Sequence, residues 1–194
     1  MVQPSAVDVD STGKILSFKD GTFWGWTRDV KELYIRDCYT QAMNTLGNAD
    51  MALIEGTPGI GKSLFIFYFI YATVRQAKDN KQEIPTFLIE DPDGLGFFLR
   101  VDGNGNGIVH KPTTATPDYL ITDTKGRSNP SFTKLYLHVF GFNNENVKYV
   151  RKLMDQRHPE SNKTRPNIYL PVFSLEEYFE IDCGKVDQVS MYVV

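Results

Sequence analysis

Residues 56–63, GTPGIGKS, restrict the fold of this chain more than any other part of its sequence. They fit the pattern G-x-x-x-x-G-K-[ST] at every fixed position. A short apolar run, 51–55, precedes them, and a longer run rich in aromatic residues, 64–74, follows. A strand, a glycine-rich turn and a helix form the setting in which this pattern binds phosphate. The sequence therefore predicts a strand over 51–55, a phosphate loop, and a helix beginning near Leu64.

The chemistry of such a loop follows from its residue types. Glycines let the backbone N–H groups point inward, next to the positive end of a helix. Lys62 can reach the β- and γ-phosphates from what we expect to be an exposed loop, and it is the first predicted catalytic residue. The Ser63 hydroxyl is a predicted ligand of Mg²⁺. The predicted nucleotide-binding residues of the loop are Gly56, Thr57, Pro58, Gly59, Ile60, Gly61, Lys62, Ser63 and Leu64. The alternative is a glycine turn that carries Lys-Ser by chance.

Composition narrows the class of protein. A length of 194 residues, with 41% hydrophobic and 23% charged residues, is typical of one well-buried globular domain. The net charge of −3 gives no basic field for nucleic acid. Cys38 and Cys183 lack metal or redox spacing, which favours reduced thiols. The first ten residues do not form a secretory signal, and the run 64–74 is too short to span a bilayer, so we expect no membrane partner.

The N-terminal part predicts three elements. Residues 1–13 suggest a flexible lead-in, and 15–26 alternate around a turn at 19–22, which predicts a small hairpin. A helix is predicted over 29–46, with Asp29 as its cap, Glu32 at the third helical position and Gly47 as its stop. The helix after the phosphate loop is apolar on all sides, so its outer face needs a cover. The helix over 29–46 is the nearest candidate, and a missing domain or partner is the other.

The rest of the chain predicts a sheet with further helices. The expected strands are 86–90, 119–123, 135–140, 169–173 and 185–194, with a hairpin of 97–101 and 108–111, and the expected helices are 143–154 and 174–181. The last helix opens with the capping box Ser-Leu-Glu-Glu. The hairpin tip, 102–107, begins like a calcium loop, but its twelfth position is Thr113 instead of Glu, which favours a turn. The predicted fold is α/β: a three-layer α/β/α P-loop NTPase of the ASCE type, with a mainly parallel sheet, an N-terminal helix and a small β-hairpin insertion. Strand 51–55 should lie in the centre of the sheet, between strand 135–140 and the last strand.

A phosphate loop requires a second acidic residue to organise Mg²⁺ at the end of a neighbouring strand. Asp123 is the preferred candidate, both as metal ligand and as catalytic residue, over Glu90 and Asp91. Thr124 occupies the position where a glutamate usually activates water, which predicts slow hydrolysis. A nuclease-like pairing of Asp118 with Asp123 is disfavoured, because residues five apart on a strand lie roughly 17 Å apart and face opposite sides.

Three segments, LYIRDCY (33–39), GTPGIGKSLFIFYFIY (56–71) and YLPVFSLEE (169–177), resemble Crinkler effectors and the related retrotransposon-hot-spot proteins of trypanosomes in sequence, order and spacing. The resemblance spans roughly 30–182 and implies a P-loop NTPase domain, often followed by a nuclease-like or kinase-like domain. It implies phosphate binding by 56–63, a Walker B aspartate at Asp123 and a position near the nucleotide for Arg36. The Crinkler header with its Leu-Phe-Leu-Ala-Lys motif and a C-terminal effector domain are absent from this sequence. Oomycete and fungal Crinklers are delivered into host cells and commonly act in the nucleus, and the resemblance implies the same setting for this chain.

Together these features predict a lead-in and hairpin over 1–28 and a P-loop NTPase domain over 29–194, cut before a lid or C-terminal effector domain. We expect Mg²⁺-dependent binding and slow hydrolysis of ATP or GTP as the regulatory domain of a Crinkler-like effector. The alternative is a nucleotide-binding or degenerate interaction module without turnover. The expected partners are the nucleotide, a second copy or the missing domain, and, through the full-length protein, host proteins or nucleic acid.

Overall fold

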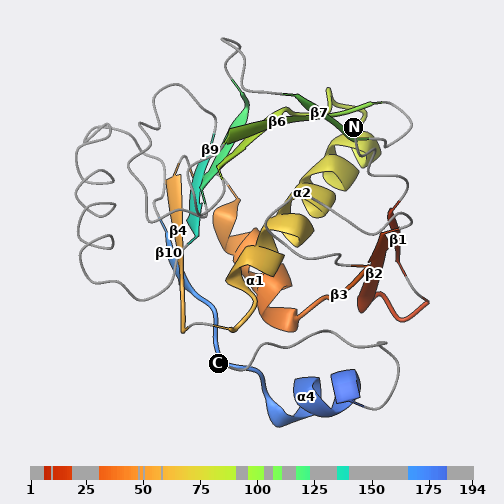
Figure 1. Cartoon of the computed structure of the whole chain (residues 1–194), viewed down its shortest axis with the longest axis vertical. Coiled ribbons are helices and arrows are strands. Elements are labelled where there is room, and N and C mark those ends of the chain that lie inside the picture. Colours follow the sequence, from red (N-terminus) through yellow and green to blue (C-terminus); the bar gives the residue numbers. More distant parts are fainter. Residues whose placement is uncertain are drawn as a thin grey trace.

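The computed structural model describes residues 7–9, 11–18, 31–47, 49, 51–57, 59–90, 96–102, 107–110, 117–122, 135–139 and 166–182 (Figure 1). Over these residues the chain is a mixed α/β protein with one sheet of seven strands and one of three. The larger sheet has the order β10-β4-β9-β8-β5-β6-β7. Its strands are β4 (Met51–Glu55), β5 (Phe87–Glu90), β6 (Gly96–Val101), β7 (Gly107–His110), β8 (Tyr119–Thr122), β9 (Leu135–Val139) and β10 (Asn167–Tyr169).

The direction of the strands follows the prediction. Strands β10, β4, β9, β8 and β5 pair in parallel, whereas β5, β6 and β7 pair antiparallel. The predicted hairpin is therefore confirmed as β6 and β7, and β4 lies between β9 and β10 as expected. The strand predicted over 169–173 lies earlier in the sequence, because β10, the last described strand, covers Asn167–Tyr169 and residues 170–173 are outside it. In the order of the sheet, strand β8 lies closer to β4 than β5 does.

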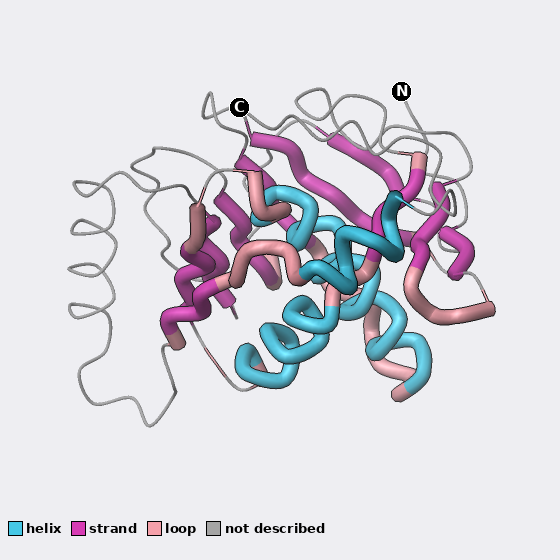
Figure 2. The backbone as a smooth tube through the Cα atoms, turned by 90° about the horizontal axis from the view of Figure 1, so that it is seen from below, coloured by secondary structure: helices cyan, strands magenta, loops and turns pink. Residues whose placement is uncertain are grey.

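Helices α1 (Asp37–Leu46) and α2 (Lys62–Asp79) pack on the same side of the larger sheet (Figures 1 and 2). Ala52 and Ile54 of β4 belong to the hydrophobic cluster that contains these helices. Leu53 lies between them on the strand and is also fully buried. Because successive side chains of a strand point to opposite faces, both faces of β4 are covered. Among the described helices none is long and apolar enough to cross a membrane.

The N-terminal residues form the smaller sheet, with β2 (Ile15–Phe18) between β1 (Val7–Val9) and β3 (Glu32–Tyr34), all antiparallel. The flexible lead-in predicted for 1–13 is therefore wrong over β1. The helix predicted to begin at Asp29 is wrong over Glu32–Tyr34, which pairs with β2, and α1 begins only at Asp37. Backbone bonds from Ile35 N to Lys14 O and from Phe18 N to Lys31 O extend this pairing. At residues 32–34, pairing with the distant strand β2 outweighs the local capping pattern that predicts a helix. Helix α1 ends at Leu46, with Gly47 following as predicted.

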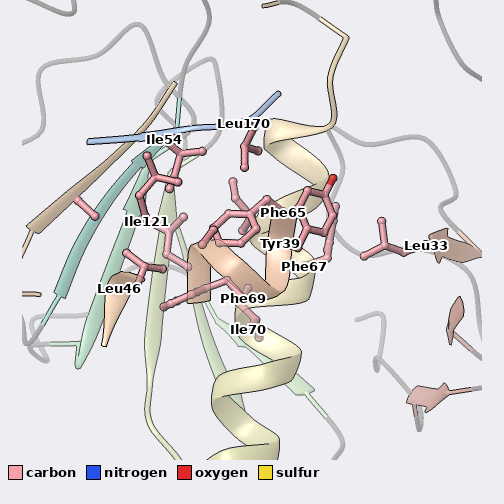
Figure 3. Close-up of a cluster of buried hydrophobic side chains, with 14 of the residues drawn as sticks. Leu33, Tyr39, Leu46, Ile54, Phe65, Phe67, Phe69, Ile70, Ile121 and Leu170 are labelled. Carbon is pink, nitrogen blue, oxygen red and sulfur yellow. The ribbon is translucent and has the colours of Figure 1, made fainter. Parts of the chain in front are cut away.

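The cover over the apolar helix α2 comes from two elements. Phe65, Phe67 and Phe69 are each at most 2% exposed. Phe65 meets Tyr39 of α1 edge-to-face, with ring centroids 5.4 Å apart, and Figure 3 shows both within one cluster. Phe67 meets Phe18 of β2 at 6.2 Å. The expected cover by the preceding helix is thus confirmed at Phe65, and the small sheet covers Phe67.

The last described element is α4 (Leu175–Asp182), below α1 in Figure 1. Its predicted capping box is confirmed: Ser174 N donates to Glu177 Oε2 at 2.9 Å, and Glu177 N donates to Ser174 Oγ at 3.1 Å. The strand pairing of 23–26, the cap at Asp29, the helix over 143–154, the strand over 185–194 and Cys183 lie outside the described residues.

Candidate functional site

The loop between β4 and α2 has the backbone conformation that its glycines predict. Gly56, Gly59 and Gly61 have φ values of 153°, 80° and 87°. A Cβ atom on Gly56 would lie 2.9 Å from the carbonyl oxygen of Leu170 and would overlap the side chain of Ile60. A Cβ on Gly61 would overlap the Tyr39 hydroxyl. Glycine is therefore required at both positions by space as well as by φ.

Lys62 is the first residue of α2, and its side chain is folded over the loop. Its ammonium group donates to the carbonyl oxygens of Gly56 at 2.9 Å and Thr57 at 2.7 Å. Lys62 is only 8% exposed, so the expectation of a charge on an exposed loop is wrong. A buried ammonium requires polar partners, and the backbone of the loop provides them. The positive charge lies at the N-terminus of an 18-residue helix, where the two fields add.

The other predicted loop residues occupy different environments. Thr57, Ser63 and Leu64 are half-buried, and Leu64 packs against the hydrophobic cluster. Gly59 is exposed, whereas the side chain of Ile60 is buried. Pro58 lies outside the described residues. Ser63, the predicted ligand of Mg²⁺, is the second residue of α2.

Arg36 lies directly behind the loop, immediately before α1. It is 1% exposed, although arginine is seldom buried without a partner. Its Nη1 donates to Ile60 O at 2.8 Å, and its Nη2 donates to Pro171 O at 3.0 Å and Val172 O at 3.1 Å. The guanidinium also pairs with Glu177 through Nε and Nη2 and lies 4.0 Å from the centre of the Phe173 ring. The resemblance placed Arg36 near the nucleotide, and the structure places it against the loop with these donors directed to protein groups.

Tyr39, one helical turn further on, adds a second contact to the back of the loop. Its hydroxyl donates to Gly61 O at 2.7 Å, and its ring is 1% exposed. Burial raises the pKa of this phenol far above its ordinary value, so it remains a hydrogen-bond donor at any physiological pH. Neither Tyr39 nor Glu177 is among the site residues predicted from the sequence. Arg36 precedes α1 with an extended backbone and Tyr39 lies in its first turn, and no local sequence pattern indicates their partners in the loop.

Asp123, which the sequence predicts as the acidic partner of the loop, lies outside the described residues, because the description of β8 ends at Thr122. Within the described residues, no three His, Cys, Asp or Glu side chains gather into a metal-binding group. Asp118 has a structural role: its carboxylate accepts from Thr86 N at 2.9 Å and Thr86 Oγ1 at 3.0 Å. These bonds join the starts of β8 and β5 and explain Asp118 without a nuclease site.

Comparison with known proteins gives two similar sequences. The chain is 32% identical over 96 residues to Crinkler effector protein 15 and, equally, to Crinkler effector protein 16, both of Phytophthora infestans. The match covers 46% of this chain and 14% of each relative, so it spans only a small part of their length. No protein-family model matches the chain. These findings support a Crinkler-like relation.

Proposed function

We propose that this chain is a P-loop NTPase domain that binds Mg·ATP or Mg·GTP at residues 56–64. The observation that carries the proposal is the loop itself. A buried parallel strand, β4, leads into three glycines with positive φ, and α2 begins with a lysine whose ammonium group is held over the loop. The ammonium group of Lys62 now donates to neutral carbonyl oxygens, and phosphate oxygens would take their place. Because phosphate oxygens are charged, they would form shorter and stronger hydrogen bonds with Lys62.

The sheet order supports the finer fold assignment. One strand, β9, lies between β4 and β8, and all three are parallel. The carboxyl ends of parallel strands meet at one edge of a sheet, which is where ligands bind in open α/β folds. Asp123 follows β8 directly in the sequence. We therefore propose Ser63 and Asp123 as the pair that holds Mg²⁺, in the three-layer ASCE-type P-loop fold.

Turnover is proposed to be slow. Lys62 and Mg²⁺ would neutralise charge on the β- and γ-phosphates, but attack by water also needs a group that orients and activates it. Thr124, the residue after Asp123, has no carboxylate for this task. The second candidate function is a nucleotide-binding or degenerate interaction module without turnover. Thr124 also favours this function, because it lacks the carboxylate that would activate water. A phosphate-release assay with Mg·ATP and with Mg·GTP separates the two.

The binding proposal is tested with Lys62→Ala. Calorimetric titration with Mg·ATP and Mg·GTP should show a loss of at least tenfold in affinity, corresponding to about 1.4 kcal/mol. Lys78→Ala is the matched control, because Lys78 is an exposed lysine in the last turn of the same helix. Thermal melting of each variant without nucleotide separates loss of binding from loss of folding. Equal affinities of the wild type and Lys62→Ala, or no binding by the wild type, would refute the assignment.

The Crinkler-like relation supports a biological setting for this activity. We propose that the domain regulates an effector that acts inside a host cell, with the nucleus as the expected compartment. The proposed partners are a second copy or a further domain of the same protein and, through that protein, host proteins or nucleic acid. Fractionation of host cells that express the full-length protein tests the compartment.

A further inference from the structure

Arg36 is among the largest fully buried side chains of the described chain, and it connects three separate segments. It touches the phosphate loop at Ile60, the extended segment at Pro171 and Val172, and the first turn of α4 at Glu177. Hydrogen bonding of the guanidinium fork to a carboxylate is geometrically demanding, and a lysine cannot reproduce it. A single cation is therefore shared between the back of the loop and the docking of α4.

The contacts behind the loop determine where its N–H groups point. The described peptide bonds are trans, and in a planar trans peptide the carbonyl of one residue and the N–H of the next point in opposite directions. Since Ile60 O points to Arg36 and Gly61 O points to Tyr39, the N–H groups of Gly61 and Lys62 point away from α1. These are the N–H groups that would line the anion site at the start of α2.

The contact with α4 is an ion pair removed from bulk water. Arg36 Nη2 lies 3.0 Å from Glu177 Oε2, and the two side chains are 1% and 13% exposed. The same Glu177 oxygen accepts from Ser174 N and so completes the capping box of α4. Loss of one partner from a buried pair leaves an uncompensated charge, which costs far more than an exposed pair would. Undocking of α4 would therefore disturb the group that holds Ile60.

We propose that Arg36 is a positioning residue of the phosphate loop, and that Glu177 couples phosphate binding at this loop to the docking of α4. The inference rests on the proposed nucleotide binding and adds a mechanism for its regulation. Phosphate binding stabilises the loop conformation that Arg36 holds, and this stabilises the Arg36–Glu177 pair. Such coupling is reciprocal. The factor by which bound nucleotide favours the docked position of α4 therefore equals the factor by which undocking of α4 lowers the affinity for nucleotide.

The test uses the 194-residue chain and two conservative variants. Glu177→Gln keeps an acceptor oxygen but removes the charge, and Arg36→Lys keeps the charge but loses the fork. We expect each to weaken Mg·ATP or Mg·GTP binding at least tenfold in calorimetry. Glu176→Gln, a fully exposed carboxylate in the same turn, is the control and should change affinity by less than twofold.

Hydrogen–deuterium exchange provides the readout that a merely structural role would not change. In the wild type, Mg·ATP should slow amide exchange in the proteolytic fragment that contains α4. This response should be lost in Arg36→Lys. Tyr39→Phe retains the Arg36–Glu177 pair and should weaken binding without abolishing the response of α4.

The outcomes separate the two proposals. Nucleotide binding that depends on Lys62, with unchanged affinity in Glu177→Gln and Arg36→Lys and no response in α4, overturns the coupling alone. Absence of binding by the wild type overturns the proposed function and the coupling with it. Should Arg36→Lys fail to fold, Glu177→Gln and the wild-type exchange experiment decide the matter.

Discussion

Gly61→Ala tests whether the loop is held by contact with α1 or by its own conformation. Gly61 has φ 87° and ψ 23°, so it is in the left-handed region, and a methyl group there would overlap the Tyr39 hydroxyl. The backbone strain costs roughly 1–2 kcal/mol. Displacing the hydroxyl breaks its bond to Gly61 O and leaves a buried polar group unsatisfied, which costs about 1–3 kcal/mol. The expected loss of unfolding free energy is therefore roughly 2–5 kcal/mol.

The Tyr39→Phe background divides this cost into its two parts. Phenylalanine leaves room for the methyl group, and Gly61 O still accepts from Phe65 N at 2.9 Å. Only the backbone strain of roughly 1–2 kcal/mol should then remain. The difference between the two backgrounds is the coupling energy of a double-mutant cycle.

Urea unfolding without nucleotide provides the measurement, with a check that the slope with denaturant is unchanged. Gly13→Ala is the matched control, because Gly13 has φ 73° and no atom lies within 4 Å of the place that a methyl group would take there. Its cost should be that of strain alone and should be the same in both backgrounds. An equal cost of Gly61→Ala with and without the Tyr39 hydroxyl would show that the contact with α1 does not hold the loop.

Three further predictions concern the core, pH and turnover. Phe67→Ala should lower the unfolding free energy by about 3–5 kcal/mol, because it removes the packing of Phe67 against Phe18. Deletion of residues 1–46 removes the same packing and should expose the apolar surface of α2, which should cause aggregation. A soluble, cooperatively melting deletion variant would contradict this. Burial, and after it the hydrogen bond to Glu180, raises the pKa of Tyr34 to about 12, so the folded state holds the phenol proton more tightly than the unfolded state. The contribution of the protonated phenol to the unfolding free energy should therefore be lost as pH rises from about 10 to 12. Urea unfolding across this range should show a smaller decrease for Tyr34→Phe than for the wild type. Phosphate release should be slow in dilute protein and should rise with protein concentration if self-association supplies a missing catalytic group, as arginine fingers do with effects of about 10³–10⁵-fold; fast release at the lowest concentration would refute this.

The sequence was most informative where local chemistry decides the backbone. The glycines of 56–63, the apolar run of β4 and the capping box before α4 each specify a conformation within a few residues, and the structure has all three. The central position of strand 51–55 was predictable for a related reason, whereas the order of the other strands was not predicted. Parallel strands need crossovers, and a strand followed by a phosphate loop allows few arrangements of its neighbours. The position of β4 between β9 and β10 follows from that restriction.

The failures occur where distant residues decide. Glu32 carried a helix signal, yet it pairs with β2, and a capping pattern contains no information about a strand partner located earlier in the chain. Lys62 was expected at an exposed loop because its type is polar, whereas the loop carbonyls of Gly56 and Thr57 satisfy it when buried. Arg36 could be named from the resemblance, but its pairing with Glu177 spans 141 residues and no local pattern predicts it.

The three segments that resemble Crinklers meet at one place in the structure. The first provides Arg36 and Tyr39, the second provides the loop and α2, and the third provides the carbonyls of Pro171 and Val172 together with Glu177. In a planar trans peptide, a carbonyl that points backward leaves the next N–H pointing forward. The carbonyls of Ile60 and Gly61 accept hydrogen bonds from the first segment. Arg36, which binds the carbonyl of Ile60, is buried, and its charge requires an anion. The third segment provides this anion as the Glu177 carboxylate. The loop, its support and the neutralising carboxylate therefore form one physical unit, although 141 residues of chain separate its two ends. For this reason we expect changes at Glu177 to be detected at residues 56–63 as well as in α4 itself.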